Sequence, residues 1–153
     1  MLEALKLLDQ EISFNLKMIA GGGGAMVLAH GFELGTYDID ATPIQHDFSE
    51  IDAAVKIVAK KLNISADWLN PYFSTFTHVL PADYATRLIR VFAGKKLIVD
   101  ALGKEDMLIM KLFIKDPHYN HADDKYQRNT KNDFVSKHYF SRAEKRANRA
   151  ISI

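Results

Sequence analysis

The chain has 153 residues, of which 48% are hydrophobic and 25% charged, and its formal net charge is +1. These values are typical of one globular domain, so we expect a single domain over residues 1–153 with its core over about 13–115. The absence of cysteine excludes disulfides, thiolate metal sites and a cysteine nucleophile. No apolar run is as long as a membrane span and the first residues do not resemble a signal peptide. We therefore expect a cytoplasmic protein without membrane contact.

Charge is distributed unevenly along the chain. From residue 125 onward there are eight basic and two acidic residues, a local net charge of +6, which leaves the preceding part acidic on balance. A basic tail of this kind is suited to holding a polyanion such as RNA. The alternative is the solvated face of a terminal helix, because residues 123–150 are expected to be helical.

Helix and strand patterns alternate along the first part of the chain. Apolar residues recur at helical spacing over residues 2–12. A short strand is expected over 17–20, and a buried helix over 25–30 that Gly31 ends. Polar and apolar residues then alternate over 36–41, as in a strand with one buried face.

The middle of the chain adds a helix, a hairpin and another helix. Asp47 and Glu50 have the spacing of a capping box, and the helix that follows should end near Asn63. The remaining expected elements are a short helix within 64–80, a hairpin of strands 87–92 and 96–102, and a helix over 104–115. Together these patterns predict an α+β fold, in which a small mixed or antiparallel sheet has helices packed around it and the C-terminus is helical.

Four consecutive glycines, residues 21–24, join the first strand to the helix that follows it. Glycine permits positive φ and close approach of a ligand to the backbone, and free N–H groups at a helix N-terminus favour a phosphate. The run lacks the Lys-Ser/Thr of a P-loop and the spacing of a dinucleotide-binding fingerprint. A flexible turn is the alternative interpretation.

Asp38 and Asp40 follow shortly after the glycines. On a strand they share a face, and strand geometry separates their carboxylates by roughly 6–7 Å. At an effective dielectric constant near 20 the two charges repel by roughly 2–3 kcal/mol, so a cation between them is expected. Oxygen ligands of this kind suit Mg²⁺, which leaves positions free for water and phosphate. The alternative is an edge strand that carries two solvated acids.

The glycine and aspartate motifs together resemble the signature of the nucleotidyltransferase superfamily. That signature is Gly-Gly or Gly-Ser, a spacer, and Asp-hydrophobic-Asp; here thirteen residues separate Gly24 from Asp38. The finer pattern is similar to the small AbiEii-like nucleotidyltransferases of abortive-infection and toxin–antitoxin systems, and the resemblance covers residues 17–124. The matching positions are Gly23, Gly24, Ala25, His30, Gly31, Thr36, Asp38 and Asp40, together with Asp106, Leu108, Lys111 and Leu112 in "LGKEDMLIMKL".

The resemblance implies an activity and a set of site residues. The activity is transfer of a nucleoside monophosphate from an NTP to a hydroxyl group of an RNA, such as tRNA, or of a protein, by a two-metal mechanism with Mg²⁺ or Mn²⁺. A cognate antitoxin or toxin protein is the implied partner. The implied catalytic and metal-binding residues are Asp38, Asp40 and Asp100, and the implied nucleotide-binding residues are Gly23, Gly24, Thr36 and Lys111.

Two of these assignments have structural alternatives. Asp100 is chosen as the third carboxylate because it interrupts an otherwise apolar strand, but a polar residue at a strand end fits equally; Asp83 is a weaker candidate. Lys111 also fits a lysine whose stem packs on the protein while its amine reaches water. Arg87 or Arg90 would reach the triphosphate.

The chain departs from the family pattern at two places. Leu34 stands where the family commonly has arginine, and "IKDPHYNHADDK" is longer and richer in histidine than the family's segment. These departures support an alternative function, a catalytically silent nucleotide- or RNA-binding relative. Residues His118, His121, Asp123 and Asp124 match no zinc spacing, so a polar loop with a helix N-cap is expected there.

Overall fold

The structure, a computed structural model, describes residues 1–33 and 35–114. Several predictions lie outside the described residues: the role of Leu34, the histidine-rich segment 118–124, the helical segment 123–150 and the basic tail.

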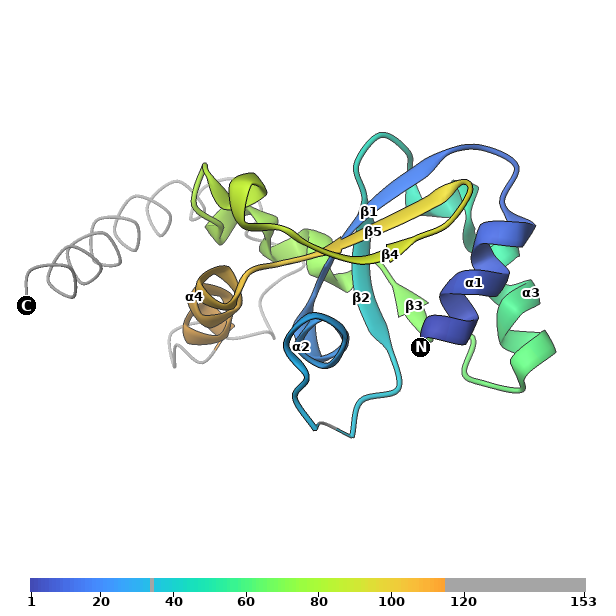
Figure 1. Cartoon of the computed structure of the whole chain (residues 1–153), viewed down its shortest axis with the longest axis horizontal. Coiled ribbons are helices and arrows are strands. Elements are labelled where there is room, and N and C mark those ends of the chain that lie inside the picture. Colours follow the sequence, from blue (N-terminus) through green and yellow to red (C-terminus); the bar gives the residue numbers. More distant parts are fainter. Residues whose placement is uncertain (34, 115–153) are drawn as a thin grey trace, which may run out of the picture.

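The described residues form five strands, four α-helices and three 3-10 helices (Figure 1). In chain order these are α1 (Leu2–Glu11), β1 (Leu16–Gly21), α2 (Gly22–His30), β2 (Ile39–Pro43), η1 (Phe48–Glu50), α3 (Asp52–Leu62), β3 (Leu69–Asn70), η2 (Tyr72–Val79), η3 (Tyr84–Arg87), β4 (Ile89–Ala93), β5 (Leu97–Ala101) and α4 (Lys104–Ile114). None of the helices among the described residues is long and apolar enough to cross a membrane.

The five strands form one mixed sheet in the order β3-β2-β1-β5-β4. Strand β1 lies at the centre, antiparallel to β2 and parallel to β5. At the two edges, β3 runs parallel to β2, and β4 runs antiparallel to β5. The predicted α+β class with a small mixed sheet is therefore confirmed for the described residues.

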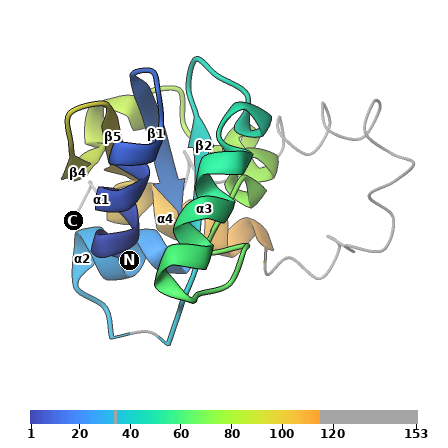
Figure 2. The same ribbon diagram turned by 90° about the vertical axis from the view of Figure 1, so that its right-hand side faces the viewer.

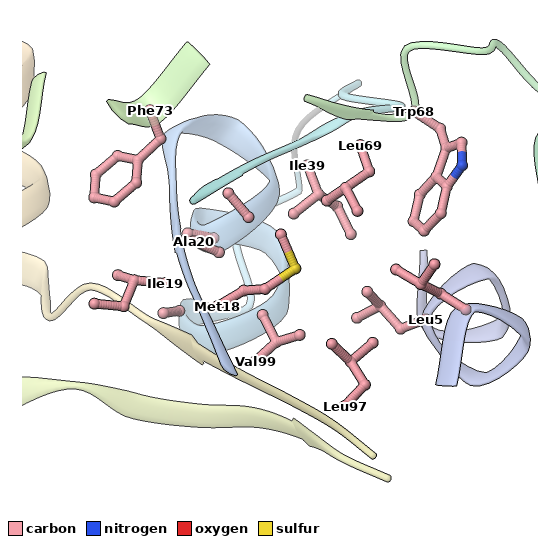
Figure 3. Close-up of a cluster of buried hydrophobic side chains, with 14 of the residues drawn as sticks. Leu5, Met18, Ile19, Ala20, Ile39, Trp68, Leu69, Phe73, Leu97 and Val99 are labelled. Carbon is pink, nitrogen blue, oxygen red and sulfur yellow. The ribbon is translucent and has the colours of Figure 1, made fainter. Parts of the chain in front are cut away.

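The hydrophobic core fills the space between one face of the sheet and helices α1 and α3, which pack against each other (Figure 2). Alternation along β1 directs Met18 into this core, where it lies with Val99 and Leu97 of β5 and with Leu5 of α1 (Figure 3). Ile19 points to the opposite face. Helices α1 and α3 thus cover one face of the sheet, while α2 contacts β1, β2 and β5, and η2 packs against β2 and adds Phe73 and Phe76 to the buried hydrophobic residues.

Several predicted elements match the structure closely. The first helix, the helix that ends at Asn63, the capping box before it and the hairpin of β4 and β5 are all present. In the capping box the backbone N–H of Asp47 donates to Glu50 Oε1 at 2.7 Å. These elements are fixed by side chains close together in the sequence, and local patterns therefore predict them.

Three elements near the glycines and aspartates differ from prediction. Helix α2 begins at Gly22, three residues earlier than expected, and β2 begins at Ile39 instead of residue 36. Asp38 therefore precedes the strand, because the Thr36 hydroxyl donates to its side chain and such local bonds compete with strand pairing. The two-residue strand β3 was not predicted.

Candidate functional site

The glycine run lies directly against the aspartate pair. Gly22 has a φ of +63°, and a Cβ placed on it would lie 2.1 Å from Asp40 Oδ2. A Cβ on Gly24 would lie 2.7 Å from the backbone oxygen of Asp38. On Gly23 it would lie 3.2 Å from the Thr36 hydroxyl. Glycine is therefore required here by close packing, and the turn that opens α2 lies beside the Asp40 carboxylate and the backbone of Asp38.

Asp38 and Asp40 occupy different environments. Asp40 lies in β2, in register with Gly21 of β1, and is half-buried on the face opposite the core helices. Asp38 is exposed and accepts a hydrogen bond of 2.7 Å from the Thr36 hydroxyl. Thr36 thus orients the more exposed carboxylate.

Asn70 completes this polar group from the neighbouring strand. It lies in β3, in register with Asp40, and its Nδ2 donates to Asp38 Oδ2 at 3.5 Å. Its side-chain oxygen accepts the backbone N–H of Tyr72 at 3.0 Å. Sequence patterns missed Asn70, since a strand of two residues carries no periodic signal.

The pKa of Asp40 is raised above its ordinary value. Burial has the largest influence, and the charge of Asp38 adds to it, whereas the polar amide of Asn70 nearby lowers the pKa of Asp40. An acid with a raised pKa beside a second acid is an unfavourable arrangement unless a cation neutralises the pair.

A pocket of about 1070 Å³ opens at the aspartates. Three of its lining residues are acids, Asp38, Asp40 and Asp67, and none of its described lining residues is lysine or arginine. The donor set of carboxylate, amide and hydroxyl oxygens fits Mg²⁺ or Mn²⁺. The lining residues are Gly35, Thr36, Tyr37, Asp38, Asp40, Ser65, Asp67, Trp68, Asn70, Pro71, Tyr72, Ser74 and Thr75.

Asp100 does not join this pair. It is buried in β5, in register with Ile19 of β1, and β1 separates it from β2. Its carboxylate is bonded to Arg90 Nε and lies 3.4 Å from Lys17 Nζ. Among the described residues no three His, Cys, Asp or Glu side chains lie close enough together to hold a metal ion. Asp100 is therefore paired with two cationic side chains, and its catalytic role gains no support from the geometry.

The other predicted site residues lie outside the pocket wall. Lys111 is exposed on α4, and neither it nor Gly23 nor Gly24 lines the pocket. Asp83, the weaker candidate for a third carboxylate, is exposed and bonded to Arg87. A role for Lys111 in nucleotide binding stays a prediction.

Gly22→Ala is expected to destabilise the fold and to weaken cation binding, because the new methyl group must displace the Asp40 carboxylate. Gly31→Ala is the matched control, since Gly31 has a φ of +67° and open space around its Cβ position. The control should lose only the stability that a left-handed backbone conformation costs alanine, about 1–2 kcal/mol. Urea unfolding and Mn²⁺ titration of both variants measure the difference. Equal losses of stability and unchanged Mn²⁺ affinity would show that the contact with Asp40 is unimportant.

A glycine turn that opens a helix beside an aspartate pair on a mixed sheet is the arrangement expected of a nucleotidyltransferase. The family model described as "Nucleotidyltransferase of unknown function (DUF6036)" matches residues 2–129, and the chain belongs to this family. No curated protein and no solved structure matches the chain. The resemblance to the AbiEii-like subtype stays a prediction.

Proposed function

We propose that the protein transfers a nucleoside monophosphate from an NTP to a hydroxyl group of an RNA or a protein. The single observation that carries the proposal is the contact between the glycine turn and Asp40, because it unites a phosphate-binding element with a cation-binding pair. Membership of a nucleotidyltransferase family supports the reaction class.

Each of the described site residues would have its own role in this reaction. Asp38 and Asp40 would hold Mg²⁺ or Mn²⁺, which when bound neutralises phosphate charge and lowers the pKa of the acceptor hydroxyl. Thr36 keeps Asp38 oriented. The first N–H groups of α2 have no partner within the helix and would donate to phosphate oxygens.

The proposed reaction is a displacement at the α-phosphorus. The acceptor hydroxyl oxygen forms a bond to that phosphorus, and the bond from the α-phosphorus to the α,β-bridging oxygen breaks. Pyrophosphate leaves with the electron pair of that bond, and the hydroxyl proton passes to solvent. Preorganised charge around the phosphates is the main contribution that a protein makes to this chemistry.

A second candidate function is nucleotide binding without turnover. The observation that favours it is the position of Asp100, which leaves the aspartate pair without a third carboxylate among the described residues. Such a relative would bind an NTP in the presence of Mg²⁺ and release no pyrophosphate. A partner toxin or antitoxin would be compatible with either candidate.

The test is transfer of label from each of the four α-labelled NTPs in the presence of Mg²⁺ and a cell extract as the source of acceptors. Wild type and the double variant Asp38→Asn/Asp40→Asn are compared. The proposal predicts labelled product only with wild type, and digestion by nuclease or protease identifies the acceptor as RNA or protein. Mg²⁺-dependent NTP binding without any labelled product would establish the second candidate instead.

A further inference from the structure

The residues in register with Asp40 determine which side chains can bind the same cation as Asp40. Strand β2 is flanked by β1 and β3, and the residues opposite Asp40 on these strands are Gly21 and Asn70. Glycine has no side chain, and Phe73 packs against the place where one would be. The only side chain in register with Asp40 is therefore a neutral amide.

The amide of Asn70 makes contacts that a carboxylate could not reproduce. Its nitrogen donates to Asp38 and its oxygen accepts from the backbone of Tyr72. A carboxylate at this position would keep the second bond and lose the first, because an ionised acid only accepts. Asn70 thus links Asp38 to the start of η2 and adds no negative charge.

The charge of the site then limits how many cations it attracts. Asp38 and Asp40 together carry two negative charges when ionised, and one divalent cation balances them. A further cation would require a further anionic ligand, since the ligands of Mg²⁺ and Mn²⁺ sites are chiefly carboxylates and phosphates. Asp100 does not supply one, because it lies across β1 in contact with Arg90 and Lys17. Asp67 lines the pocket, but among the described residues it forms no group of three such side chains that could hold a metal ion.

We infer that Asn70 is a positioning residue that occupies the place of a third acid, so that the protein alone binds one divalent cation on Asp38 and Asp40. This inference rests on the proposed function, because it assumes that the aspartate pair is a cation site. It predicts that a second cation, where the reaction uses one, arrives with the phosphates of the nucleotide.

The experiment titrates Mn²⁺ into the full chain without nucleotide and follows free Mn²⁺ by its electron paramagnetic resonance signal. Wild type should bind one Mn²⁺, and Asp40→Asn should bind none at that site. Asn70→Asp should bind Mn²⁺ at least about 10-fold more tightly, because ligand charge sets the affinity of such sites. Asn70→Ala, which loses the bond to Asp38, should bind it about 10-fold more weakly.

Two control variants test whether the effect depends on the position of residue 70 or only on the total charge of the pocket. Ser74→Asp adds an acid to the same pocket at a position not in register with Asp40, and Asp67→Asn removes one from the pocket wall. Both should change the Mn²⁺ affinity less than about 2-fold. Asn70→Asp retains the oxygen that accepts from Tyr72, so it preserves the turn even where Asn70→Ala unfolds the chain.

The results that overturn the inference differ from those that overturn the proposed function. Two Mn²⁺ bound by wild type, or equal tightening in Asn70→Asp and Ser74→Asp, would refute the role of Asn70 and leave the aspartate site intact. If wild type binds no Mn²⁺, or if Asp40→Asn binds Mn²⁺ as wild type does, the cation site itself is refuted and with it the inference.

Discussion

Asp40→Asn is expected to lower the rate of nucleotide transfer about 10³-fold without destabilising the fold at neutral pH. The loss follows because Asp40 is the half-buried member of the pair and lies against the turn that would hold the phosphates. Several kcal/mol of charge stabilisation by a bound metal correspond to about this factor in rate. Initial rates of label transfer at saturating Mg²⁺ measure it, with Asp67→Asn as the control that removes a charge from the pocket wall.

The stability of the same variant tests the electrostatics independently. Burial and the charge of Asp38 raise the pKa of Asp40 in the folded state above its ordinary value of 3.8. Such a group contributes stability that is fully present below the unfolded-state pKa and is lost as the pH rises through the folded-state pKa. Asparagine does not ionise, so the free energy of unfolding of Asp40→Asn, relative to that of wild type, should increase between about pH 3 and pH 7.

Urea unfolding in the presence of a metal chelator checks this trend. A difference in the free energy of unfolding between variant and wild type that stays constant over the same pH range would contradict the raised pKa of Asp40. Full transfer activity in the variant would contradict its role as a cation ligand.

Arg87→Ala is expected to destabilise the protein by about 3–5 kcal/mol, the usual cost of leaving a buried charge without its partner. Asp106 of α4 is 0% exposed, and Arg87 donates to both of its carboxylate oxygens, from Nε at 3.0 Å and from Nη2 at 2.7 Å. This pair links the end of η3 to the first turn of α4. In the variant Asp106 would remain buried and unpaired, and urea unfolding at neutral pH measures the loss.

Asp83→Ala supplies the matched control for this prediction. Arg87 also donates to Asp83, at 2.6 Å and 3.0 Å, but Asp83 is exposed. Exposed ion pairs contribute little to stability, so the control should lose far less than Arg87→Ala. Similar losses in the two variants would show that the buried contact with Asp106 is not what stabilises this part of the fold.

The motif that contains Asp106 illustrates that residues of one family pattern can have different physical roles. Asp106 and Lys111 match one stretch of the nucleotidyltransferase signature, and nucleotide binding by Lys111 stays a prediction. In the structure the acid anchors an arginine, while the lysine is exposed on α4. A sequence match identifies positions of interest, but the contacts decide whether each side chain holds a ligand or another part of the protein.

Local features of the fold and site were predictable from the sequence. The capping box of Asp47 and Glu50 and the hairpin of β4 and β5 depend on residues near one another in the chain. The glycine run and the pair Asp38 and Asp40 could be predicted to lie together, because a strand-turn-helix followed by a strand brings them to one edge.

The remaining features depend on contacts between distant residues. Asn70 faces Asp40 only through the register of β2 and β3, and a shift of one residue would direct its side chain to the other face. Asp9 shows the same limitation: it accepts the backbone N–H groups of Lys95, Lys96 and Leu97, more than 80 residues away. No local pattern contains such information.

The measurement that tests the central claim most directly is calorimetric titration of a non-hydrolysable NTP into the full chain, with and without Mg²⁺, for wild type and Asp40→Asn. It requires no knowledge of the acceptor. A metal-dependent nucleotide site at the aspartate pair predicts one NTP bound per wild-type chain with Mg²⁺, and binding at least about 10-fold weaker without Mg²⁺ or in the variant. Nucleotide binding that is absent, or that is indifferent to both Mg²⁺ and Asp40, would contradict the account.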